Sequence, residues 1–227
     1  GDFFYQVKGN LSYTRAMTRH YEMAEQGNSY LNWRNGCEDR LNGIWWGYGS
    51  NGRIEIGENA RIEAPNMWLE TSSGTNGLIE ITGGNLRIRG FHAYGNKDAP
   101  DVSTNVISVS GGTHTMVMDT SGSYVALTVG QMSCHSLFEM TGGKLYMPRI
   151  VRVGYSTTGT GSATMRMLGG DLELTPDGNQ TPVLNVCDSR DSNGRLELLG
   201  GVLRAGGVRG WTGARNKGGS GWAVFFA

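Results

Sequence analysis

Short runs in which apolar and polar residues alternate recur along the chain, and five of them lead into a pair of glycines. The five copies read LIEITGGNL at residues 78–86, VISVSGGTH at 106–114, LFEMTGGKL at 137–145, TMRMLGGDL at 164–172 and RLELLGGVL at 195–203. The spacing between copies is roughly 26–31 residues, and a fixed period in this range is typical of a solenoid.

Alternation with a period of two indicates strands, because successive side chains of a strand point to opposite faces. Aligning the copies gives three apolar columns: one before the double glycine, one after it, and one in a third run. We expect all three columns to face a common core. The column before the glycines is Ile79/Ile81, Ile107/Val109, Phe138/Met140, Met165/Met167 and Leu196/Leu198; the column after them is Leu86/Ile88, His114/Met116, Leu145/Met147, Leu172/Leu174 and Leu203/Ala205; the third is Ile44/Trp46, Met67/Leu69, Leu127/Val129, Val151/Val153 and Leu184/Val186.

A single coil cannot bury its apolar face, whereas stacked coils bury a continuous core and pair each strand with the same strand of the next coil. We therefore predict an all-β fold, a right-handed parallel β-helix (solenoid) of about seven three-stranded coils, forming a single domain over residues 1–227. The right hand follows from the general preference of crossover connections.

Residues 15–43 break the repeat. Within them, Met17, Tyr21 and Ala24 have the spacing of one helix face, which predicts a short helix over residues 15–26. We expect a helix and loop insertion that packs on the flank of the solenoid or over its end. A binding loop is the alternative, because repeat proteins often carry binding surfaces on insertions.

Charged residues fall between the apolar columns. Glu139, Arg166 and Glu197 occupy one outward column on neighbouring coils, so their charges alternate in sign at cross-strand distance. We expect each exposed pair to add a few tenths of a kcal/mol and to help set the register.

Composition excludes several function classes. The formal net charge is zero, which argues against a non-specific partner such as nucleic acid or an anionic membrane. No run of 18 apolar residues occurs, so we expect no membrane insertion, and the first residues lack the shape of a signal peptide. Cys37, Cys134 and Cys187 do not make a disulfide framework; we expect reduced, packed thiols, with one bridge and one free thiol as the alternative.

The GG-x-L phrase, followed by an apolar strand that ends in Val-Gly or a small polar turn, resembles β-solenoid repeats of large secreted bacterial surface proteins. These are the autotransporter-passenger-like repeats, also found in proteins with PEP-CTERM-type sorting signals. The resemblance covers roughly residues 44–227 and a fragment at the N-terminus. It implies an exported, extracellular or cell-surface protein with a structural or adhesive role, and it carries over no catalytic residues.

One corner gathers oxygen ligands of the kind that Ca²⁺ prefers, at Asp188, Asp191 and Asn193. The spacing does not match an EF-hand loop, so a solvated corner is the favoured interpretation. A calcium site and a lyase-like site are the alternatives. No two histidines stand at metal-ligand spacing and no Cys-x-x-Cys occurs, so we expect no zinc and no other cofactor.

His114 stands in an apolar column between Leu86 and Leu145. A general acid or base is conceivable at this position. We favour a histidine at the edge of the core that is hydrogen-bonded to a turn.

Tryptophans cluster in the first third of the chain, and Trp45, Trp46 and Trp68 are the candidates for stacking on sugar rings. Packing of the insertion against the flank explains the same residues more simply. A carbohydrate-binding adhesin would need these side chains exposed in a row.

Both ends of the chain carry apolar strands, and an open solenoid end templates pairing with another chain. We expect the protein to be a non-enzymatic structural solenoid that self-associates end to end into a fibre or belongs to a longer surface rod. The alternative is a carbohydrate-binding adhesin or a polysaccharide lyase or hydrolase, for which Asp119, Asp171, Asp188, Asp191, Arg166 and Arg190 would have to converge in one cleft. The residues expected at the assembly ends are Phe3, Phe4, Tyr5, Trp222, Phe225 and Phe226.

Overall fold

The computed structural model describes residues 3–8, 21–23, 29–34, 38–40, 44–46, 52–57, 61–64, 67–71, 76–88, 91–95, 103–116, 125–131, 134–148, 150–155, 161–176, 181–187, 193–210 and 221–225. Every regular element in these residues is a strand. No helix among them is long and apolar enough to cross a membrane.

The strands form two sheets, and all the strand pairs are parallel. The larger sheet makes two faces of the solenoid, with β18 and β20 running from one face to the other. Its strands, in order of pairing, are β1 (Phe3–Lys8), β3 (Ser29–Arg34), β6 (Gly52–Ile56), β9 (Asn76–Ile81), β12 (Ser103–Val109), β15 (Cys134–Met140), β18 (Ser162–Thr175), β16 (Lys144–Pro148), β13 (Thr113–Met116), β10 (Asn85–Ile88), β7 (Arg61–Ala64) and β4 (Glu38–Arg40), with β20 (Gly194–Arg204) on β18 and β22 (Gly221–Phe225) on β20.

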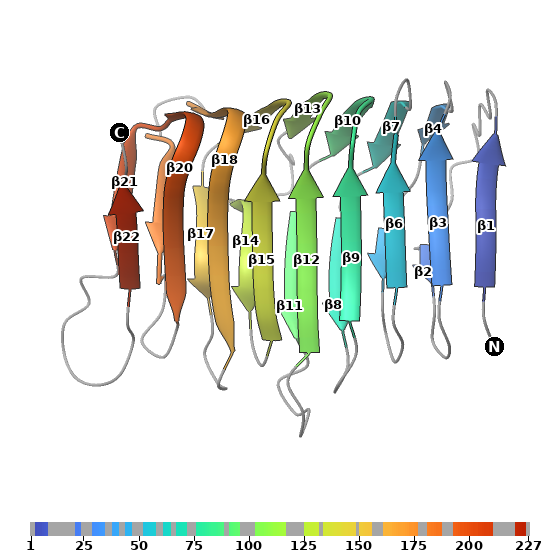
Figure 1. Ribbon diagram of the computed structural model, residues 1–227, viewed down its shortest axis with the longest axis horizontal. Helices are drawn as coiled ribbons and strands as arrows, with labels where there is room; N and C mark the ends of the chain where they lie inside the picture. Colours follow the sequence, from blue (N-terminus) through green and yellow to red (C-terminus); the bar gives the residue numbers. More distant parts are fainter. Residues whose placement is uncertain are drawn as a thin grey trace.

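The eight-stranded sheet makes the third face. Its strands, in order of pairing, are β2 (Tyr21–Met23), β5 (Ile44–Trp46), β8 (Met67–Thr71), β11 (Phe91–Gly95), β14 (Val125–Gln131), β17 (Ile150–Tyr155), β19 (Val183–Val186) and β21 (Gly207–Gly210). Figure 1 shows the resulting rod, in which equivalent strands lie side by side from the N-terminal to the C-terminal end. The parallel β-solenoid expected from the repeat is confirmed.

About three consecutive turns, between residues 134 and 210, have all three strands and their side chains described. The expected number of seven coils is not confirmed. Among the described residues, segments between 21 and 40 add strands to the stack that the expected insertion did not include.

The helix expected over residues 15–26 is not confirmed either. Tyr21–Met23 form β2, which pairs in register with Ile44–Trp46 of β5. Ser29–Arg34 and Glu38–Arg40, expected as loop, form β3 and β4 and pair with β6 and β7. Pairing with a neighbouring turn therefore outweighs the local helix spacing, and the rest of residues 15–43 lies outside the described residues.

The core is the continuous apolar interior that the three columns predicted. We call the face made by the strand segments before the double glycines the first face. Phe138, Met165 and Leu196 follow one another in register on it, and each is 0% exposed. Burying a side chain of this size contributes about 1.5–3 kcal/mol. Other column members that are buried are Ile79, Ile81, Leu86, Ile107, Val109, Leu127, Val129, Met140, Leu145, Met147, Val151, Val153, Met167, Leu172, Leu174, Leu184 and Val186.

Candidate functional site

The double glycine makes the corner between the first two faces, and each of its two glycines is needed for a different steric reason. A Cβ on Gly142 would lie 2.4 Å from the carbonyl oxygen of Ser110 in the preceding turn. Gly143 has a left-handed backbone with φ of 78°, and its Cβ would lie 2.7 Å from the carbonyl oxygen of Gly111. The corners therefore stack as closely as the strands do, and the motif is accounted for by the fold.

Backbone hydrogen bonds continue the ladder through these corners. The Lys144 amide donates to the Gly112 carbonyl at 2.9 Å, and the Asp171 amide donates to the Gly143 carbonyl at 2.9 Å. The corner is thus part of the parallel sheet rather than an interruption of it.

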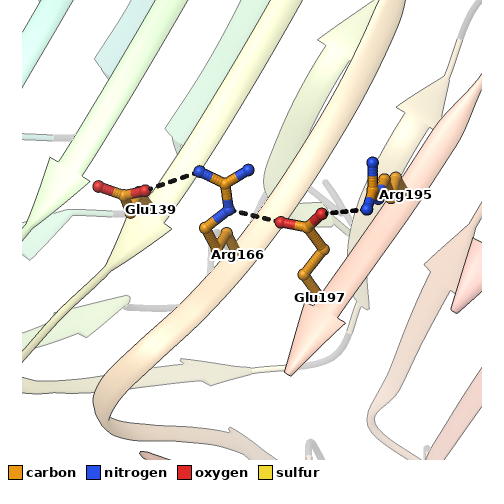
Figure 2. Close-up of polar contacts among 4 residues, drawn as sticks. All are labelled: Glu139, Arg166, Arg195 and Glu197. Carbon is orange, nitrogen blue, oxygen red and sulfur yellow. Dashed lines mark hydrogen bonds and ion pairs between the residues drawn. The ribbon is translucent and has the colours of Figure 1, made fainter. Parts of the chain in front are cut away.

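A charge ladder crosses the first face on β15, β18 and β20 (Figure 2). Arg166 lies between Glu139, with Nη1 3.2 Å from Oε2, and Glu197, with Nε 2.5 Å from Oε2. Arg195 contacts the other oxygen of Glu197 at 2.6 Å. The alternating column expected from the sequence is confirmed.

The ladder differs from the expected exposed pairs in one respect: the Glu197 side chain is 6% exposed. Its hydrogen bond to Arg166 raises the pKa of that guanidinium further above its ordinary value, so Arg166 stays charged. Arg195 was not among the expected ladder residues. It stands two residues before Glu197 on the same face of β20, so the period-two pattern could have identified it.

The last fully described turn has an open core. Leu172 and Leu184 are 0% exposed. In the next turn, the register partner of Leu172 is Leu203, which is half-buried. The register partner of Leu184 is Val208, which is 40% exposed. Ala205 is also half-buried against the core. The inward column thus continues into this turn but is left partly uncovered there.

The expected assembly residues lie on the outermost described strands of the first face. Phe3, Phe4 and Tyr5 belong to β1, and Trp222 and Phe225 belong to β22, whereas Phe226 lies outside the described residues. In Figure 1 these two strands stand at opposite ends of the rod. β1 and β22 are therefore separated along the axis of the rod.

The expected calcium corner is described in part. Asn193 donates from Nδ2 to the carbonyl of Gly161 at 3.4 Å, while Asp188 and Asp191 lie outside the described residues. Across the described part of the chain, no group of three or more His, Cys, Asp or Glu side chains could hold a metal ion.

The candidate tryptophans fall at two kinds of register position. Trp45 of β5 and Trp68 of β8 are direct register partners, and the column continues through His92 and Thr128. Trp46 pairs instead with Leu69, in the column expected to face the core. The backbone therefore brings two of the three candidates together on neighbouring turns.

The residues proposed for a lyase-like cleft are separated where they are described. Arg166 lies before the double glycine of β18 and Asp171 after it, so the two belong to different faces. Asp171 approaches Arg204 at 4.0 Å, and Arg166 joins the charge ladder. Asp119, Asp188, Asp191 and Arg190 lie outside the described residues.

His114 stands as the sequence indicated. His114 is 0% exposed and its Nε2 lies 2.8 Å from the carbonyl oxygen of Gly111, which makes it the core-edge histidine bonded to a turn. Cys134 and Cys187 are buried, and neither takes part in a disulfide within the described residues. Cys37 lies outside the described residues.

No protein-family model, no curated protein and no solved structure matches the chain. The solenoid architecture therefore rests on the strand pairing of the chain itself. The resemblance to autotransporter-passenger-like or PEP-CTERM-associated repeats is not confirmed by any family match.

Proposed function

We propose that the protein is a non-enzymatic structural solenoid that grows turn upon turn, with a second copy of the chain continuing the stack at the open last turn. The observation that carries this proposal is the exposure of Val208, 40% against 0% for its register partner Leu184. Both residues occupy the same inward column, and a further turn stacked on β21 would bury Val208 as β21 itself buries Leu184.

The backbone supports the same conclusion. Within the described residues β21 is an edge strand of the eight-stranded sheet, and the second half of β20 is an edge of the larger one. Edge strands present rows of N–H and C=O groups that template pairing with another strand. A parallel turn of the same repeat satisfies these groups in the geometry that every inner turn already uses.

The charge ladder suits the outer surface of a structural scaffold, and it is unlike a substrate site. Its carboxylates and guanidinium groups already pair with one another between turns. Paired charges of this kind fix the register between turns. Because the carboxylates and guanidinium groups pair with one another, they are not available to bind a ligand.

The finer parts of the proposal come from the resemblance and from the repeat. They are a right-handed coil of about seven turns, an extracellular or cell-surface location and a bacterial surface role. A longer surface rod would use the same stacking chemistry as a fibre, with the next turn supplied within one chain rather than by a second copy.

The test compares wild-type protein with Val208→Lys by sedimentation velocity and negative-stain electron microscopy. We expect wild-type chains to associate with increasing concentration into rods joined at their ends. A lysine in the inward column places a charge in the apolar junction, so we expect association to weaken at least about tenfold, the equivalent of about 1.4 kcal/mol.

Leu168→Lys is the matched control, because Leu168 is 45% exposed but lies at the outer corner before a double glycine. This variant should associate like wild type. Wild-type protein that stays monomeric at high concentration, or equal loss of association in both variants, would contradict the proposal.

A further inference from the structure

The imidazole of His114 occupies a position that leucine fills in both neighbouring turns. β13 pairs with β10 and β16, which places His114 in register with Leu86 and Leu145. All three residues are 0–1% exposed. A titratable ring therefore lies inside the apolar stack, between turns that have none at that position.

The ring makes one hydrogen bond, to the double-glycine corner that precedes it in the same turn of the solenoid. Nε2 lies 2.8 Å from the Gly111 carbonyl oxygen, and because that oxygen can only accept, Nε2 carries the proton. Nδ1 is then an acceptor, and it is buried with no hydrogen-bond partner among the described residues. A Cβ on Gly112 would lie 2.7 Å from Cε1 of the ring, so the ring uses the space that the glycine leaves.

No described group stands ready to stabilise a positive charge on this ring. The facing residues on β10 and β16 are Leu86 and Leu145, and Lys144 of β16 is exposed on the other side of the strand. Of the other described buried residues, Glu197 is the only acidic one, and it lies on β20 several turns away.

Protonation of His114 favours the opened turn over the closed one. Burial lowers the pKa of His114 below the ordinary value of 6.5, and the bond to the Gly111 carbonyl opposes this less strongly. The opened turn, in which the ring meets water, therefore takes up a proton first as the pH falls. The stability of this layer is fully present above pH 6.5 and declines as the pH falls from 6.5 through the lower pKa of the closed turn.

We propose that the turn carrying His114 is a built-in acid-sensitive point of the solenoid, at which mild acid opens the stack between β10 and β16. In a solenoid each turn contacts only its neighbours, so a loss of stability at one turn opens that turn before the others. Acid then loosens the rod internally at residues 103–116, whereas heat or denaturant acts on all turns.

The experiment is hydrogen–deuterium exchange with mass spectrometry on the full chain, at about pH 7.5 and about pH 5.5, with rates corrected for intrinsic exchange. In wild-type protein we expect protection factors in peptides covering 103–116 to fall up to about tenfold between the two conditions. Peptides covering 162–175 should change much less.

Three variants separate the effect of His114 from the general effects of acid. His114→Leu continues the leucine column and should abolish the local loss of protection; His114→Gln, uncharged and still polar, serves the same purpose if the leucine variant does not fold. His135→Leu removes an exposed histidine that bonds to Ser162, and it should behave like wild type. Loss of protection that persists without His114, that disappears in His135→Leu, or that is equal in all turns would overturn the proposal.

Discussion

At the scale of single residues, the double glycine is the feature on which the stacking depends. A Cβ on Gly143 would collide with the Gly111 carbonyl oxygen at 2.7 Å, and the backbone there is left-handed. Gly207 differs on both counts. Its backbone is not left-handed, and its Cβ would meet its first neighbour, Val183 Cγ1, at an ordinary 3.8 Å. The two glycines thus look alike in the sequence and differ in what they tolerate.

We predict that Gly143→Ala lowers the free energy of unfolding by at least about 1–2 kcal/mol, because left-handed backbone and a backbone clash both oppose the added methyl group. Gly207→Ala should stay within about 0.5 kcal/mol of wild type. Chemical denaturation followed by circular dichroism measures both. A mild effect of Gly143→Ala would show that the corner can widen without disturbing the ladder.

At the scale of elements, the charge ladder ties three consecutive strands together. Glu197 is almost fully buried between Arg166 and Arg195, whereas the contact of Asp171 with Arg204 is long and the Arg204 side chain is 55% exposed. The two kinds of pair should differ in energy, because an exposed ion pair is screened and a buried carboxylate needs its partners.

Arg166→Met is expected to destabilise the protein by about 1–3 kcal/mol, since it leaves the buried Glu197 carboxylate with one partner fewer. Arg204→Met should change stability by less than about 0.5 kcal/mol. Thermal denaturation of both variants tests this, and Glu197→Gln combined with Arg166→Met should recover part of the loss. Equal effects at the two arginines would mean that burial of Glu197 does not matter.

Also at this scale, residues 21–23 show where sequence reasoning failed. Tyr21 and Met23 fit a helix face with Met17, yet they also alternate around Glu22 as in a strand. The structure adopts the strand because β5 supplies a parallel partner in register. A short local period cannot decide between the two when a neighbouring turn offers a full set of backbone hydrogen bonds.

At the scale of the whole molecule, the rod is a one-dimensional stack in which position along the axis decides what a residue contributes. Leu172 and Leu203 are register partners in the same inward column, but Leu172 is 0% exposed and Leu203 is only half-buried. Among the described residues, Leu172 has a register partner on both sides, Leu145 and Leu203, whereas Leu203 has one only in Leu172.

In dilute protein, Leu172→Ala should cost about 2–5 kcal/mol and Leu203→Ala about 1 kcal/mol, because the second removes a contact on one side alone. Urea unfolding at low protein concentration measures both values. If the open turn is covered by a second copy, the cost of Leu203→Ala should rise with protein concentration while that of Leu172→Ala stays constant. A high cost for Leu203→Ala in the monomer would show that the last turn is already closed.

The sequence by itself determined the architecture and the core. The spacing of the double glycines and the period-two columns predicted parallel turns, the inward position of residues such as Phe138 and Leu196, and the Glu139–Arg166–Glu197 column, because these features follow from a backbone that repeats. The tertiary structure decided what depends on neighbours along the stack: the burial of Glu197, the orphaned nitrogen of His114 and the exposure of Val208. One turn of the repeat resembles the next in sequence, so only the stacking of turns reveals which copies are covered on both sides and which are not.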